Sequence, residues 1–249
     1  MPALHPSSTV AVVIPAKDEQ DRIAETVRAV AGLAVVDVVV VVDDGSTDLT
    51  SKAARDAGAV VVAHRRNRGK AAAMRTGARA VADWESARPR PGVRPRPLLL
   101  VDADLAASAV ETAPLTVPVL AGEADMTIAV LPRQATAGGG RGFVVGLSRR
   151  GTVAATGWSP EQPLSGMRCL TRAAFEAALP LAPGWGVETA LTIDLLRAGF
   201  RVREVPCDLH HRVSGRDLRG QLHRAAQFRD VARALGRRRV QDVLRRSTR

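Results

Sequence analysis

The stretch that decides the fold is Leu98-Leu99-Leu100-Val101-Asp102-Ala103-Asp104. Its apolar run predicts a buried parallel strand that ends at two carboxylates. Residues i and i+2 of an extended chain point to the same side, and two like charges held that close repel unless a cation lies between them. Because open α/β sheets bind ligands at the carboxyl ends of their strands, Asp102 and Asp104 predict a divalent metal with a phosphate on its other side. A solvated strand end or a helix N-cap is the alternative that this stretch alone leaves open.

Strands and helices alternate on both sides of this stretch. Apolar runs predict strands, and apolar residues at helical spacing predict helices. The expected strands are 10–14, 35–42, 59–63, 98–104, 126–131 and, at an edge of the sheet, 201–206. The expected helices are 18–31, from 46 or 47 to 57, from the turn at 67–69 to 82, 172–178 and 187–198, with more helices closing the chain. This order predicts a doubly wound, mostly parallel α/β sheet in one compact domain over residues 1–249.

Composition narrows the class of protein. The chain has 249 residues, 46% of them hydrophobic, which suits a sizeable core, and it has no apolar run long enough to span a bilayer. The N-terminus lacks the charged start and apolar core of a signal peptide, so we expect a cytoplasmic protein. Cys169 and Cys207 form no spaced metal pair and are expected in the core. The net charge of +11 favours anionic partners, but the absence of tyrosine argues against a platform that stacks single-stranded nucleic acid.

Polar residues follow each of the first four expected strands. These strand ends are 15–19, 43–48, 64–70 and 102–104. In a parallel sheet they lie along one edge, where a nucleotide could use them. Asp43 or Asp44 would accept from a base, Glu19 or Asp102 from a ribose, and Lys70 would meet a pyrophosphate at a helix N-terminus. The chain lacks both GxxxxGK[ST] and, after its first strand, GxGxxG, which disfavours P-loop and dinucleotide-binding proteins.

Four of these segments together resemble the donor half of GT-A-fold glycosyltransferases of the family-two type. They read IPAKDE (14–19), VVDDGSTD (41–48), NRGKAAAMRTG (67–77) and LLLVDADL (98–105), with Asp18 where the family usually has asparagine. The resemblance implies that residues 1–131 bind a nucleotide sugar, with a UDP-sugar favoured. The donor-binding residues that it implies are Pro15, Ala16, Lys17, Glu19, Asp43, Asp44, Ser46, Lys70, Asp102 and Ala103.

The second half, residues 132–249, resembles the glucosyl-3-phosphoglycerate synthases. The segments that carry the resemblance are GGGR (138–141), QPLSG (162–166), GWGVE (184–188) and HR (211–212). It implies that His211 joins Asp102 and Asp104 on the metal. The acceptor-binding residues that it implies are Gly140, Arg141, Trp185 and Glu188. Arg212 and Arg216, near Ser214-Gly215, are expected from their charge to form a second anion site for the acceptor. Gly142-Phe143 and Trp185 depart from the family's pattern in the expected acceptor pocket.

We therefore expect a glycosyltransferase that depends on Mg²⁺ or Mn²⁺, with Asp104, Lys70 and Glu188 as its catalytic residues. The acceptor is expected to be a small anion such as 3-phosphoglycerate. Inversion at the sugar follows if Glu188 is a general base, and retention follows if Glu188 only positions the acceptor. A homodimer stays among the candidate assemblies.

Two other functions remain open from the sequence. The basic, helical C-terminus over 218–246 could rest on an anionic membrane, as a polyprenyl-phosphate sugar transferase would require. Charge alone would also fit a non-catalytic nucleic-acid-binding protein, although the carboxylates at the strand ends would repel phosphate, so we expect no nucleic-acid partner.

Overall fold

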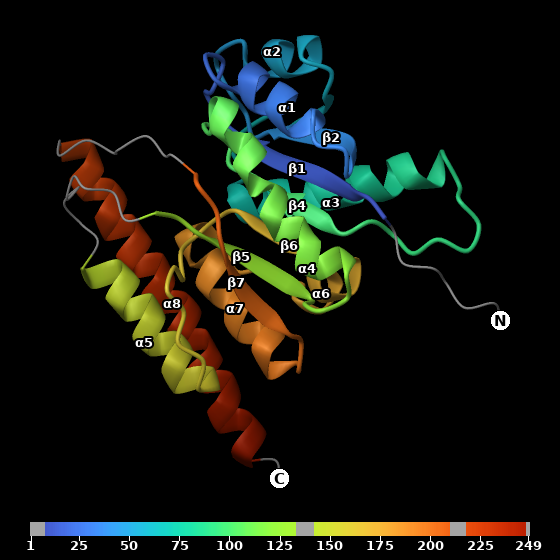
Figure 1. The fold of residues 1–249 in the computed structure, drawn as a ribbon. Coiled ribbons are helices and arrows are strands. Elements are labelled where there is room, and N and C mark those ends of the chain that lie inside the picture. The colour runs from blue at the N-terminus through green and yellow to red at the C-terminus, as the bar shows by residue number, and fades with distance from the viewer. Residues whose placement is uncertain (1–7, 133–141, 210–217, 248–249) are drawn as a thin grey trace.

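A seven-stranded sheet organises the chain, in the order β3-β2-β1-β4-β6-β5-β7 (Figure 1). The computed structural model describes residues 8–132, 142–209 and 218–247. The strands are β1 (Val10–Ala16), β2 (Val36–Asp43), β3 (Val60–Ala63), β4 (Leu98–Leu100), β5 (Met126–Val130), β6 (Arg168–Leu170) and β7 (Val202–Pro206). All neighbouring strands are parallel except β6, which runs antiparallel to both β4 and β5. The predicted α/β class with a mostly parallel sheet is confirmed.

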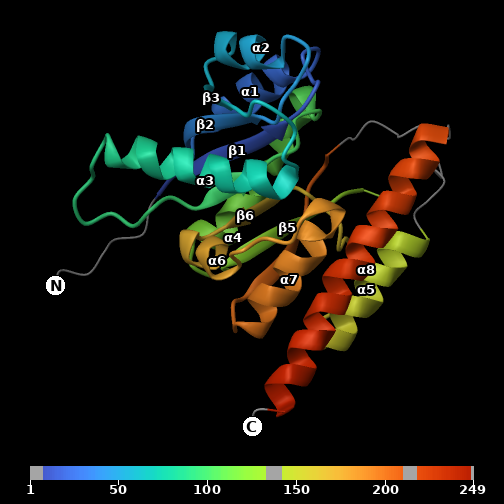
Figure 2. The same cartoon turned by 180° about the vertical axis from the view of Figure 1, so that it is seen from behind.

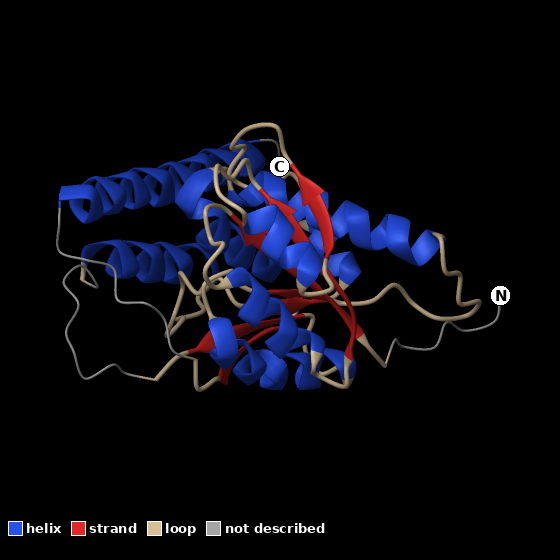
Figure 3. Ribbon diagram, turned by 90° about the horizontal axis from the view of Figure 1, so that it is seen from above, coloured by secondary structure: helices blue, strands red, loops and turns tan. Residues whose placement is uncertain are grey.

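Helices cover both faces of the sheet (Figure 3). They are α1 (Ile23–Ala31), α2 (Thr50–Asp56), α3 (Lys70–Ser86), α4 (Thr116–Leu120), α5 (Phe143–Thr156), α6 (Arg172–Ala177), α7 (Val187–Arg197) and α8 (Leu218–Ser247), with 3-10 turns η1 (Ala106–Leu115) and η2 (Gly184–Gly186). Helices α1 and α2 share one core with η1, whereas α3, α6 and α7 share the core on the opposite face. Helices α5 and α8 lie side by side beyond the sheet (Figures 1 and 2).

Strand β1, which lies inside the sheet between β2 and β4, shows why this architecture forms. Its residues alternate between the two cores, with Val10, Val12 and Ile14 in one and Ala11 and Val13 in the other. A strand that is buried on both faces needs a continuous apolar run, which is the pattern of parallel sheets covered by helices. Consequently β1, β2, β3 and β4 run in the same direction and their carboxyl ends meet at one edge, as predicted.

Several predicted boundaries were wrong because loop residues have partners that the periodicity does not reveal. Strand β4 ends at Leu100, so Asp102 and Asp104 follow it in a turn rather than within the strand. Helix α1 begins at Ile23 instead of residue 18, and α2 begins at Thr50 instead of 46 or 47. Helix α3 continues to Ser86, beyond the expected end at 82, whereas the edge strand β7 was predicted closely.

Several elements were missed altogether, among them α4 and the 3-10 turns η1 and η2. Strand β6 is only three residues long and contains the buried Arg168, so no apolar run marks it. Helix α5 was not expected over 143–156. The two cysteines are buried, as predicted. Among the helices described, none combines the length and the apolar character that crossing a bilayer requires. The proposed division of the chain into halves at residue 131 stays a prediction.

Helix α3 approaches β1 so closely that only glycine fits at position 77. A Cβ atom added to Gly77 would overlap the Cγ1 atom of Val13, which is fully buried. We predict that Gly77→Ala lowers the free energy of unfolding by about 1–3 kcal/mol, the usual cost of an overpacked core. Urea denaturation measures it. The matched control is Gly236→Ala in α8, where nothing lies within 4 Å of the added atom; stability there should stay level or rise, and equal losses in both variants would contradict the packing argument.

Candidate functional site

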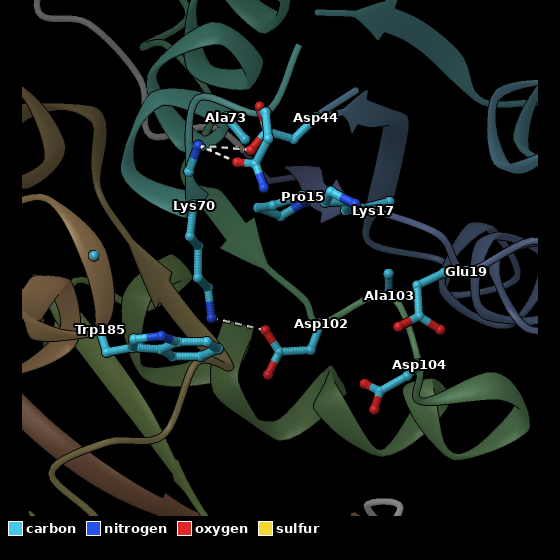
Figure 4. Close-up of a pocket in the computed structure, with 14 residues that line it drawn as sticks. Pro15, Lys17, Glu19, Asp44, Lys70, Ala73, Asp102, Ala103, Asp104 and Trp185 are labelled. Atoms are coloured by element: carbon cyan, nitrogen blue, oxygen red, sulfur yellow. Dashed lines mark hydrogen bonds and ion pairs between the residues drawn. The ribbon is translucent and has the colours of Figure 1, made fainter. Parts of the chain in front are cut away.

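A cleft of about 460 Å³ opens at the carboxyl edge of the sheet. The loops after β1, β3 and β4, the start of α3 and the turn η2 form its walls (Figure 4). Its lining residues are Pro15, Ala16, Lys17, Glu19, Asp44, Asn67, Gly69, Lys70, Ala73, Asp102, Ala103, Asp104, Gly184 and Trp185. This is where a doubly wound sheet binds its ligand.

The loops after β1 and β2 are fastened to each other by reciprocal hydrogen bonds. The backbone amide of Asp18 donates to Ser46 Oγ at 2.9 Å, and Asp18 Oδ1 accepts from the amide of Thr47 at 2.8 Å. Hydrogen bonds from the Lys17 side chain and the Thr47 amide lower the pKa of Asp18. The amide of Glu19 donates to Thr50 Oγ1 at 2.8 Å. Ser46 and Thr47 are thus engaged with the neighbouring loop, which is why they do not begin α2.

Asp43 lies beneath this pair of loops. It is 5% exposed, and it accepts hydrogen bonds from the Ser46 amide at 2.8 Å and from the Ser51 hydroxyl. Neither Asp43 nor Ser46 lines the cleft as the structure describes it. Their assignment to the donor stays a prediction, and the observed contacts show how both residues shape the loop.

Asp44 fastens the loop after β3 to the sheet. Its carboxylate accepts from the amides of Arg68 at 2.8 Å and Gly69 at 2.7 Å, and His64 Nδ1 lies 2.7 Å from it. The side chain is 5% exposed. The turn that it holds leads directly into α3, so Asp44 fixes the position from which Lys70 enters the cleft.

Lys70 joins two distant parts of the chain at the centre of the site. Its ammonium lies 2.9 Å from Asp102 Oδ1 and 3.0 Å from Glu188 Oε1. Burial by itself would lower the pKa of Lys70, but the charges of Asp102 and Glu188 outweigh burial and raise the pKa. Lys70 therefore stays cationic, and Figure 4 shows its ammonium directed at Asp102 on the floor of the cleft.

A fully buried cation, Arg168, supports this cluster from the side away from the cleft. Arg168 is 1% exposed and donates to the carbonyl oxygens of Ser165 at 2.8 Å and Pro163 at 3.3 Å. Burial lowers the pKa of Arg168 to about 10, although the nearby charge of Glu188 opposes that shift. The chain segment that Arg168 holds leads to Gly166, where an added Cβ would lie 2.5 Å from Lys70 Nζ. Glycine at 166 therefore makes room for the lysine.

Asp102 and Asp104 both line the cleft, although they lie beyond the strand. The Arg22 guanidinium donates to the Asp104 carbonyl at 3.1 Å, and the Thr26 hydroxyl donates to the Ala103 carbonyl at 2.9 Å, so α1 holds this turn in place. Mg²⁺ is commonly held by one or two carboxylates together with substrate phosphates and water. Two carboxylates facing an open cleft fit that pattern.

The structure describes only some of the other residues predicted to bind the metal or the acceptor. Within 8–132, 142–209 and 218–247 no group of three His, Cys, Asp or Glu residues is placed to hold a metal. His211, Gly140, Arg141, Arg212 and Arg216 lie outside the described residues, as does most of the glycine-rich segment 135–142. Trp185 lines the cleft, and Glu188 lies behind Lys70.

Sequence reasoning missed some residues of the site. Asn67, Gly69 and Gly184 line the cleft and lie inside motifs that drew attention for other residues. Ala73 also lines it, one helical turn after Lys70. Arg168 had no signal at all, because a buried arginine in a three-residue strand matches no pattern of charge or periodicity.

The fold and the cleft define an α/β protein with a charged cleft at the carboxyl edge of a doubly wound sheet. Comparison with known proteins makes the class more specific. The family model described as "Glycosyl transferase family 2" matches residues 11–83. The glucosyl-3-phosphoglycerate synthase of Mycolicibacterium paratuberculosis is 34% identical over 210 residues, which is 75% of this chain and 59% of that protein. The chain thus spans about three-fifths of the length of this relative.

Solved structures agree with the sequence relatives. The glucosyl-3-phosphoglycerate synthase of Mycobacterium tuberculosis in complex with Mn²⁺, uridine-diphosphate and phosphoglyceric acid superposes with a TM-score of 0.72 at 28% identity, covering 93% of this chain and 78% of that one. The same synthase with Mg²⁺ and uridine-diphosphate gives a TM-score of 0.71 at 28% identity, with coverage of 93% and 79%. The chain belongs to glycosyl transferase family 2, and its fold is that of the GT-A glycosyltransferases.

The network around Asp44 predicts a measurable loss of stability. In Asp44→Asn the amide NH₂ would have to face a backbone N–H of Arg68 or Gly69, because both carboxylate oxygens accept in the native protein. We expect the free energy of unfolding to fall by about 1.5–3 kcal/mol, the range for hydrogen bonds to a charged group. Chemical denaturation of Asp44→Asn, with the exposed Asp21→Asn as the control, measures the difference; an unchanged midpoint for Asp44→Asn would show that the carboxylate does not hold the loops.

Proposed function

We propose that this protein is a metal-dependent glycosyltransferase that moves a sugar from a UDP-sugar to a small anionic acceptor such as 3-phosphoglycerate. One observation carries the proposal: Lys70, Asp102, Asp104 and Glu188 converge at the carboxyl edge of the sheet. Lys70, Asp102 and Asp104 line the cleft there, and Glu188 is ion-paired to Lys70. The relatives' complexes with uridine-diphosphate and phosphoglyceric acid support this choice of donor and acceptor.

The donor half offers the groups that a nucleotide sugar needs. Pro15, Ala16 and Lys17 supply backbone at the cleft wall, and Glu19 supplies a carboxylate that a ribose can use. The loops behind them are fixed by Asp18 and Asp44, so the donor would meet a preformed surface. Preformed sites lose less conformational freedom on binding.

Asp102 and Asp104, with His211, are the proposed ligands of Mg²⁺ or Mn²⁺. When bound, such an ion neutralises the donor's diphosphate and makes it a better leaving group. Both metals occur with uridine-diphosphate in the structures of the Mycobacterium tuberculosis synthase.

Lys70 adds a fixed positive charge beside the proposed donor site. Since the ammonium is held by Asp102 and Glu188, it needs no rearrangement to face negative charge that develops on the departing nucleotide. Trp185 lines the cleft and is the proposed wall of the acceptor pocket. Arg141, Arg212 and Arg216 are proposed to attract the acceptor's phosphate or carboxylate.

Glu188 fits a positioning role better than that of a general base. It is 7% exposed, and the Lys70 ammonium occupies Oε1 at 3.0 Å. A base must come within hydrogen-bond reach of the acceptor proton, and a carboxylate that is 7% exposed offers little surface for that approach. We therefore favour transfer with retention at the anomeric carbon, with Glu188 orienting the substrates.

The residual alternatives have less support. Neither a polyprenyl-phosphate sugar transferase nor a nucleic-acid-binding protein appears among the relatives described above. We propose that residues 1–131 bind the donor and 132–249 the acceptor, and that the reaction uses the cytoplasmic pool of nucleotide sugars. A homodimer stays a prediction, and sedimentation would test it.

The metal proposal predicts the effect of Asp104→Ala. Transfer from UDP-glucose to 3-phosphoglycerate should fall by at least about 100-fold, because even groups that only orient metal ligands often contribute that much. The far-ultraviolet circular dichroism and melting temperature should stay close to those of the wild type. Wild-type activity should disappear with EDTA and return with Mn²⁺.

The control for this variant is Asp83→Ala, which removes an exposed carboxylate near the far end of α3. It should keep full activity. Near-normal turnover by Asp104→Ala, or activity that survives chelation, would contradict the mechanism. Failure of the wild type on UDP-glucose, but turnover of another nucleotide sugar, would correct the donor alone.

The position of Glu188 predicts the stereochemistry. The proton NMR spectrum of the product should show the small anomeric coupling of an α-linked glucose, as expected for retention from UDP-α-glucose. A large coupling, which marks the β-anomer, would return Glu188 to the role of general base.

A further inference from the structure

Helix α8 contacts the wall of the cleft from outside. It packs against the η2 turn, which carries Trp185 and leads into α7 and Glu188. Helices α7 and α8 are labelled in Figures 1 and 2. Trp185 is 39% exposed and lines the cleft, where Figure 4 shows its ring extending toward Lys70 and Asp102. The position of the indole follows the backbone of the η2 turn to which it is attached.

That backbone is pressed against α8 at two glycines. Gly184 has φ +67°, and a Cβ added there would overlap the carboxylate of Asp230. A Cβ added at Gly186 would lie 2.6 Å from the Asp230 carbonyl oxygen and 2.8 Å from Ala234 Cβ. Glycine is required at 184 both by the left-handed conformation and by the absence of space. The turn therefore fits directly onto one residue of α8.

Asp230 is also bonded to the turn. Its Oδ2 accepts from the backbone amide of Trp185 at 3.3 Å, while Oδ1 accepts from Arg229 Nε at 3.1 Å. The Asp230 side chain is 14% exposed, whereas that of Arg229 is 58% exposed. Because exposed ion pairs contribute little, the contact with Arg229 is not expected to fix Asp230. The hydrogen bond to the Trp185 amide is the contact that joins Asp230 to the η2 turn.

We propose that Asp230 is a positioning residue that sets the place of Trp185 and thereby tunes the affinity for the acceptor. It touches neither substrate in this account. It acts by holding the η2 turn, so its loss should displace the indole without removing any group that reacts. The effect on acceptor affinity rests on the proposed function, but the effect on the place of Trp185 does not.

The test compares Asp230→Ala, Asp230→Asn and the control Asp194→Ala. Asp194 of α7 accepts from Arg238 Nε of α8 at 2.7 Å, so its loss loosens the same pair of helices without touching η2. Protein labelled with 5-fluorotryptophan gives one fluorine NMR signal for each of Trp84, Trp158 and Trp185, and Trp185→Phe identifies the third.

We expect Asp230→Ala to shift the Trp185 signal and to raise KM for 3-phosphoglycerate about five-fold, the value of one ordinary hydrogen bond. The kcat should change by less than about two-fold, since no reacting group is lost. Asp230→Asn should behave nearly as the wild type, because its amide oxygen can still accept from the Trp185 amide.

Three results would overturn the proposal. They are an unchanged Trp185 signal in Asp230→Ala, an equal shift in Asp194→Ala, and a fall in kcat with an unchanged KM. If the wild type transfers no sugar to 3-phosphoglycerate, the proposed function fails there, and the fluorine spectra still decide whether Asp230 places Trp185.

Discussion

The structure depends on the contact of one partly buried ammonium, that of Lys70, with two carboxylates from different parts of the chain. Asp102 follows the central strand β4, whereas Glu188 begins α7 in the second half. Glu188 is 7% exposed, so without the lysine its carboxylate would be a buried charge that lacks its ion-pair partner, which costs several kcal/mol. The Asp102 side chain is 28% exposed, so water screens its charge. The same lysine opens α3, where an anion is favoured by the helix N-terminus. A contact that joins the two halves therefore also prepares the cleft for a phosphate.

Glycines make room for the charged side chains around Lys70, and backbone amides hold Asp44 in place. Gly166 leaves room beside Lys70, and Gly184 leaves room for the Asp230 carboxylate. Asp44 is saturated by backbone amides and fixes the turn from which Lys70 projects. The charged groups of the cleft are thus held by contacts outside it, so a ligand could approach without first reorganising the loops. This is the usual basis of electrostatic preorganisation.

Much of this was predictable from particular residues. The valine-rich β1 and β2 and the leucines of β4 have the continuous apolar pattern of buried parallel strands. Because the carboxyl ends of parallel strands lie along one edge of the sheet, Lys70 and Asp102 were expected close together. The local geometry of the site was harder to predict from the sequence. Asp102 and Asp104 share the cleft because a turn places them there, not because a strand continues. Arg168 and Asp230 could not be found, since their roles arise only from which backbone lies against them in three dimensions.

The most direct test of the central claim is a crystal structure of the protein with Mn²⁺ and UDP, with manganese located by its anomalous scattering. The account predicts a manganese peak that is bonded to Asp104 or Asp102 and to the diphosphate, with the Lys70 ammonium beside the same phosphates. A manganese peak away from these aspartates, or UDP bound elsewhere on the protein with this cleft empty, would contradict it.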